Sequence, residues 1–152
     1  MTLAPDDHPT AMRHIDWLAR LLAARGMPRL LMELHLEHLE RQLATRLPER
    51  AARYTGLAAA ARVLREERLR TIPEERAAEL AARFAAGLET EARIAPAEAA
   101  TLLVAAAADE LAGVVHAEKG LTRWLAEPSR FSRRWRTAVE RTLEDAHRRP
   151  SG

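Results

Sequence analysis

Apolar residues recur along most of this chain at the three- and four-residue spacing of an amphipathic α-helix, with charged residues between them. One such stripe runs from Phe131 to Leu143 in steps of four residues. The spacing predicts helices over about 10–25, 28–47, 48–70, 71–90, 96–118 and 130–147, and a short helical turn over 121–126. No segment repeats at a fixed period. We therefore expect one domain over residues 1–152, with flexible tails at 1–9 and 148–152.

Residues that start or end helices fall between these segments. Gly26 suits the left-handed position that follows a helix C-terminus. Pro28 and Pro96 suit the first turn of a helix, where a missing N–H costs little. Thr71 and Glu74 have the spacing of a capping box, in which each side chain binds the other residue's backbone N–H.

The segment from Ala99 to Ala108 contains no charged residue, although Asp, Glu, Lys and Arg make up 30% of the sequence. A helix that is apolar on all sides is surrounded by protein. We therefore predict an all-α protein, a single compact bundle of about six helices packed around a central buried helix at about 96–118. Its length is similar to that of a globin, although no motif supports a closer relation.

The composition narrows the class of protein. Hydrophobic residues make up 47% of the chain, much of this alanine, the strongest helix former, and aromatic residues only 4%. The chain has no cysteine, which excludes disulfides and cysteine-ligated metal sites. The N-terminal residues do not have the pattern of a signal peptide, and no uncharged stretch reaches the ~20 residues of a membrane span. We expect a protein of a bacterial-type cytoplasm, without membrane contact.

The helix predicted over 28–47 carries two apolar lines, one that includes Met32 and Leu36 and another through Leu31, Leu34, His35 and His38. A helix of this kind contacts neighbours on two sides, and the second line favours a protein partner or self-association as a dimer. Methionines near the start of this helix suit an adaptable small-molecule pocket between helices. The residues predicted to line a ligand pocket are Trp17, Leu31, Met32, His35, His38, Asp109 and His116.

The favoured function is therefore a non-enzymatic regulatory, sensory or adaptor domain, with a helical interface and a small apolar pocket. One alternative is a metal- or haem-binding protein that uses His35, His38 and His116, because imidazole is a common metal ligand. The spacing of these histidines fits no zinc-protease or di-iron motif. We expect no cofactor and no enzymatic activity: Asp109 could act as a buried general acid or base, but no nucleophile or Gly-rich phosphate loop accompanies it.

A second alternative is nucleic-acid binding by the arginine-rich C-terminal segment. Residues 119–152 carry nine basic and four acidic residues, an excess that could bind phosphates. The residues that would carry this function are Arg130, Arg133, Arg134 and Arg136. Phe131 and Trp135 could stack on bases, but both belong to an apolar stripe and are expected in the core. We therefore favour a protein partner over nucleic acid.

Overall fold

The computed structural model describes residues 8–148, which form seven α-helices and one 3₁₀ helix. No strand occurs in this range; Glu91 and Ile94 form an isolated bridge in a loop. The elements, in chain order, are α1 (His8–Ala23), α2 (Arg29–Arg46), η2 (Pro48–Tyr54), α3 (Thr55–Thr71), α4 (Glu74–Ala85), α5 (Pro96–Leu111), α6 (Ala117–Leu125) and α7 (Arg133–His147). The all-α prediction is confirmed. The predicted tails lie largely outside the described residues.

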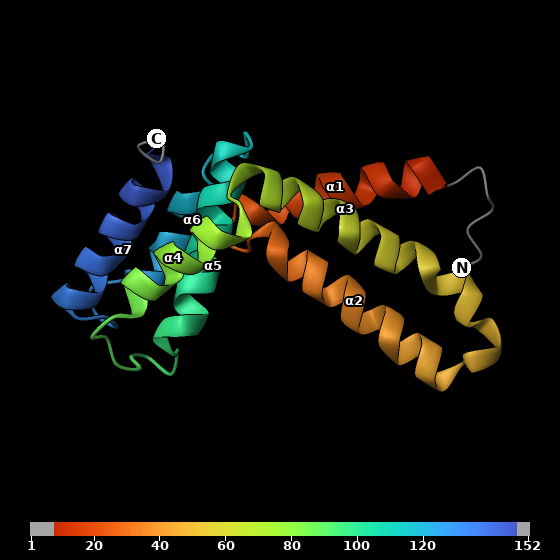
Figure 1. Cartoon of the computed structure of the whole chain (residues 1–152), viewed down its shortest axis with the longest axis horizontal. Coiled ribbons are helices and arrows are strands. Elements are labelled where there is room, and N and C mark those ends of the chain that lie inside the picture. The colour runs from red at the N-terminus through yellow and green to blue at the C-terminus, as the bar shows by residue number, and fades with distance from the viewer. Residues whose placement is uncertain (1–7, 149–152) are drawn as a thin grey trace.

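The helices form two groups that share α5. α2 and α3 run side by side as a long hairpin closed by η2, and α1 packs against both of them (Figure 1). Leu36 of α2 and Leu64 of α3 are buried together in this group. The second group, α4 to α7, has a larger core that contains Phe84, Leu103 and Trp135. The hairpin extends away from this second group (Figure 1).

α5 is the central helix, as the uncharged segment predicts. It contacts each of the other six α-helices. Leu103 and the run from Ala105 to Ala108 are buried, and small side chains at these positions let neighbouring helices approach closely. The single helix with apolar residues on all sides thus lies where both groups of helices meet.

The predicted end of this central helix is wrong. α5 ends at Leu111 rather than near residue 118, because Gly113 adopts the left-handed conformation (φ +99°) and His116 does the same (φ +67°). The chain then starts a separate helix, α6, in place of the predicted short turn. The Glu110 carboxylate accepts a hydrogen bond from the Glu118 backbone N–H at 2.8 Å, which satisfies one free donor in the first turn of α6.

Two other predicted helix ends have different outcomes. The capping box at Thr71 is wrong: its hydroxyl donates to the Glu67 carbonyl oxygen at 3.1 Å, since Thr71 is still the last residue of α3. The prediction for Gly26 is confirmed: this residue adopts the left-handed conformation (φ +95°) after α1. A Cβ on Gly26 would lie 2.5 Å from the Gly120 carbonyl oxygen of α6, so this turn also needs glycine for close contact.

Candidate functional site

An apolar groove of about 510 Å³ opens to the surface between α1 and α2. Its volume is in the range of small-molecule and peptide sites. Three residues predicted from the sequence, Leu31, Met32 and His35, line it together. The full lining is Ala19, Leu22, Met27, Pro28, Leu31, Met32 and His35.

Large apolar side chains are also exposed near this groove on both of its helices. Leu18 precedes the groove residue Leu22 by one helical turn on α1 and is 40% exposed. Leu34 follows Leu31 by three residues on α2 and is 49% exposed. The opposite side of α2 is buried against α3 through Leu36. The second apolar line of α2 therefore has no covering element within the described residues.

The other predicted pocket residues lie elsewhere. Trp17 is 63% exposed and does not line the groove. His38 is exposed on α2, and His116 is exposed in the turn before α6. Asp109 is buried in the interior of the bundle. Among residues 8–148, no three His, Asp or Glu side chains gather in a way that could hold a metal ion.

Asp109 links α5 to the start of α2. Its Oδ2 accepts a hydrogen bond from the Arg29 backbone N–H at 2.8 Å, and its Oδ1 accepts one from Arg29 Nε at 2.9 Å. Asp109 is 1% exposed and Arg29 3%. Because Arg29 is the first residue of α2, the carboxylate also caps that helix at its positive end. Arg29 Nη1 reaches Glu67 of α3 at 2.7 Å, so the pair joins three helices.

This arrangement is structural rather than catalytic. Burial raises the pKa of the Asp109 carboxyl above its usual range, and the hydrogen bonds from Arg29 oppose only part of that rise. Both carboxylate oxygens already accept hydrogen bonds from Arg29. A general acid or base needs an oxygen within reach of the proton it transfers, and Asp109 is 1% exposed and does not line the α1–α2 groove. The sequence predicted a buried Asp109, but not its partner 80 residues away.

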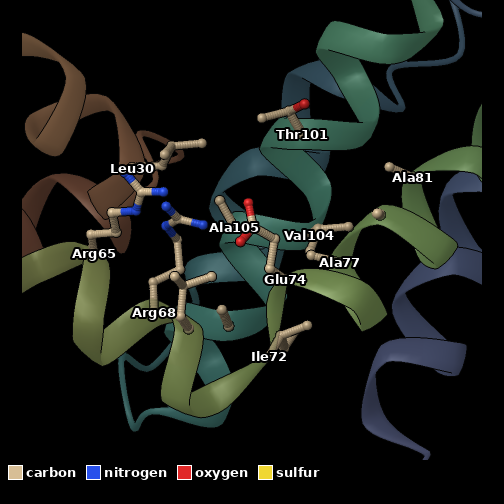
Figure 2. A pocket seen from close by; sticks show the side chains of 13 residues that line it. Leu30, Arg65, Arg68, Ile72, Glu74, Ala77, Ala81, Thr101, Val104 and Ala105 are labelled. Carbon is tan, nitrogen blue, oxygen red and sulfur yellow. The ribbon is translucent and has the colours of Figure 1, made fainter.

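A second, smaller cleft of about 240 Å³ lies between helices α2 to α5. Arg65, Arg68 and Glu74 extend toward its middle, above a floor that includes Val104 and Ala105 (Figure 2). Arg68 is already paired with Glu33, through hydrogen bonds of 2.9 and 3.1 Å. This cleft could not be predicted from the sequence, because the residues that line it come from four separate helices, α2 to α5.

The four arginines predicted to bind nucleic acid do not share one site. Arg133 and Arg134 line a groove between α4 and α7, whereas Arg130 is exposed in the turn before α7. Arg136 does not line that groove, and its Nε is buried without a hydrogen-bond partner. As expected, Trp135 lies in the core: it stacks on Phe131 at a ring-centroid distance of 4.9 Å.

No protein-family model, curated protein or solved structure compared with this chain matches it. Within residues 8–148, none of the helices combines the length and the apolar character needed to span a bilayer. A function is therefore inferred from the surfaces of the protein itself. Two surfaces stand out, the apolar groove between α1 and α2 and the arginine-lined groove between α4 and α7.

Proposed function

We propose that this chain is a non-enzymatic regulatory or adaptor domain that acts through the α1–α2 groove, and that the groove is occupied by a second copy of the chain. The observation that carries the proposal is the open apolar groove with an exposed leucine near it on each of its helices, Leu18 and Leu34. Contiguous apolar surface of this kind is typical of protein interfaces.

The occupant is inferred from the shape of the surface. In a two-fold dimer the same patch faces itself, so it must carry both a depression and the side chains that fill a depression. The α1–α2 surface has both, because Leu18 and Leu34 protrude beside the groove. Met27, at the edge of the groove, is 48% exposed and is flexible enough to adapt to an incoming side chain.

The state of Asp109 supports a role other than catalysis. It is the most deeply buried carboxylate with a raised pKa, and both of its oxygens bind Arg29. The acid–base role considered for it would require this link between α2 and α5 to open. A surface that binds a partner has no such requirement.

Sedimentation equilibrium over a range of protein concentrations tests the proposal. We expect the wild type to be a dimer, and Leu34→Gln to raise the dimer dissociation constant at least about tenfold, which corresponds to about 1.4 kcal/mol. Val115→Gln is the matched control, since Val115 is 66% exposed but lies in the turn before α6, and it should dimerise as the wild type does. Circular dichroism checks that both variants fold.

Three results would overturn the proposed dimer. A wild type that stays monomeric at the highest concentration has no second copy in the groove. Equal weakening by Leu34→Gln and Val115→Gln would place the interface elsewhere. A monomer that binds the apolar dye 1-anilinonaphthalene-8-sulfonate, and loses that binding in Leu34→Gln, would make a small molecule the occupant instead.

A further inference from the structure

A groove of about 550 Å³ runs between α4 and α7, in the other group of helices from the α1–α2 groove. Four arginines line it, two in the first turn of α7, one two turns further along α7, and one on α4. The full lining is Arg83, Phe84, Ala86, Leu88, Arg133, Arg134, Thr137, Ala138 and Arg141. The groove thus combines an apolar floor with guanidinium groups along its walls.

Most of this positive charge is not neutralised within the described protein. Arg83 pairs with Glu79 at 3.1 Å and lies 4.0 Å from Asp145. Within residues 8–148, no carboxylate lies within 4.0 Å of the other three groove arginines; the ion pairs there involve other cations. Guanidinium groups that line one groove without carboxylate partners favour an anion as its occupant.

Gly87 leaves room for the Arg134 guanidinium beside the loop that follows α4. A Cβ on Gly87 would lie 2.7 Å from Arg134 Nη2, so the guanidinium reaches from α7 across to the loop that follows α4. Gly87 has a φ of +72°, which favours glycine for a second reason. Arg141 follows Arg134 by seven residues, about 10 Å along the same face of α7. The donors therefore surround a space rather than form a flat patch.

Helix polarity adds to the argument. Arg133 and Arg134 stand in the first turn of α7, where the positive end of the helix dipole disfavours cations, and no acidic residue accompanies them in that turn. The nearest capping group is Ser132, whose hydroxyl accepts from the Trp135 N–H at 3.2 Å and donates to Glu91. The Glu91 carboxylate also accepts from the Ser132 backbone N–H at 2.7 Å, so it offsets part of the positive charge at this end of α7. One carboxylate does not match two arginines, which leaves charge for a bound anion.

We propose that this groove binds a small amphiphilic phosphate monoester. The phosphate carries up to two negative charges and three acceptor oxygens, which suits several arginine forks at once. The apolar body of the ligand would lie on the floor formed by Leu88 and Ala138. Nucleic acid is the less favoured occupant, because Glu79 and Asp145 lie beside Arg83 and interrupt the basic surface there.

Isothermal titration calorimetry with the full chain and three probes tests the site. 1-Naphthyl phosphate should bind at least about tenfold more tightly than inorganic phosphate, which lacks the apolar body, and than 1-naphthol, which lacks the anion. Arg134→Gln should weaken binding of 1-naphthyl phosphate at least about tenfold. Arg123→Gln, which removes the same charge from an exposed position on α6, should leave it unchanged.

Gly87→Ala tests whether the position of the Arg134 guanidinium matters when its charge is kept. It keeps every arginine but displaces the Arg134 guanidinium, so it should weaken 1-naphthyl phosphate binding while the protein stays folded by circular dichroism. The proposal is overturned if 1-naphthyl phosphate does not bind, or if Arg123→Gln weakens binding as much as Arg134→Gln. It is also overturned if duplex DNA binds more tightly than 1-naphthyl phosphate, with the steep salt dependence of phosphate-backbone contacts. None of these results depends on whether the α1–α2 surface forms a dimer.

Discussion

Replacement of Arg29 by methionine isolates the energetics of the buried link between α2 and α5. Methionine keeps much of the side-chain volume and removes the charge. The Asp109 carboxylate, 1% exposed, then loses the hydrogen bond from Arg29 Nε and keeps only the one from the residue-29 backbone N–H. Glu67 and Asp16, the other carboxylates beside Arg29, are far more exposed and can turn to water.

The expected loss is large for a single substitution. Removal of one partner of a buried ion pair typically costs about 3–5 kcal/mol, because the remaining charge is buried without compensation. A domain of this size has an unfolding free energy of about 5–15 kcal/mol. The variant should therefore fold with much of its stability gone. Arg29→Met combined with Asp109→Asn should recover about 2 kcal/mol, since the amide oxygen still caps α2 and no charge remains buried.

The stability that Arg29→Met loses should also depend on pH. Burial raises the pKa of Asp109 in the wild type, and removal of Arg29 takes away the contacts that oppose this rise. The folded variant then holds the Asp109 proton at pH values where the unfolded chain, with a pKa of about 3.9, has released it. Its stability should be highest below that unfolded value and fall as pH rises through the folded pKa. The double variant has no carboxyl at position 109, so its stability should not show this fall with pH.

Urea unfolding followed by circular dichroism, at pH 5 and at pH 7.5, measures these differences. Arg70→Met is the matched control, because Arg70 is 75% exposed and its ion pair with Glu66 is long, at 4.0 Å. This substitution should change the free energy of unfolding by less than about 1 kcal/mol. A loss below about 1 kcal/mol in Arg29→Met would refute the reasoning. So would a variant that is more stable at pH 7.5 than at pH 5, relative to the double variant.

Three further substitutions test packing and capping by urea unfolding. Ser132→Ala removes the cap on the Trp135 backbone N–H and should cost about 1 kcal/mol. Trp135→Phe should cost about 2–3 kcal/mol, because it leaves a cavity and deprives the Leu125 carbonyl oxygen of its 2.9 Å indole donor. Gly120→Ala would gain about 1 kcal/mol in a free helix, yet here it should cost about 2–3 kcal/mol, because the new Cβ would lie 2.6 Å from the Gly26 nitrogen. A neutral result in any of the three would contradict the contact named.

The features that could be predicted from the sequence are those set by neighbours along the chain. The uncharged run from Ala99 to Ala108 is buried because a helix with no polar face needs protein on every side. Gly26 adopts the left-handed turn that its position after a helix predicts. The line through Leu31 and Leu34 lies outside the buried core, and the partner contact that it indicates stays a prediction. Each of these conclusions uses residues within about four positions of one another.

The features that could not be predicted depend on how distant elements meet. The end of α5 is an exception, because it is set locally: the Gly113 and Val114 N–H groups donate to the Glu110 and Asp109 carbonyl oxygens, the pattern of a helix that ends at glycine. The apolar periodicity past Leu111 hid this signal in the sequence. The partner of Asp109 lies 80 residues away and is one of many arginines in the chain. Nothing in the sequence of α4 indicates that Arg83 lines a groove. It belongs to an anion groove only because α4 packs beside α7.

The uneven charge of the C-terminal segment was a correct observation with too coarse an interpretation. Along the sequence, Arg133, Arg134 and Arg136 form one basic run, as a nucleic-acid contact would require. In a helix, adjacent residues point in different directions, so the run divides: Arg134 faces α4 and Arg136 does not line the groove. What remains is a small group of guanidiniums drawn from two helices, in which the missing side chain of Gly87 leaves room for the Arg134 guanidinium. Within residues 8–148 no carboxylate pairs with Arg133, Arg134 or Arg141, so ion pairs do not explain this group, and an anion bound in the groove does.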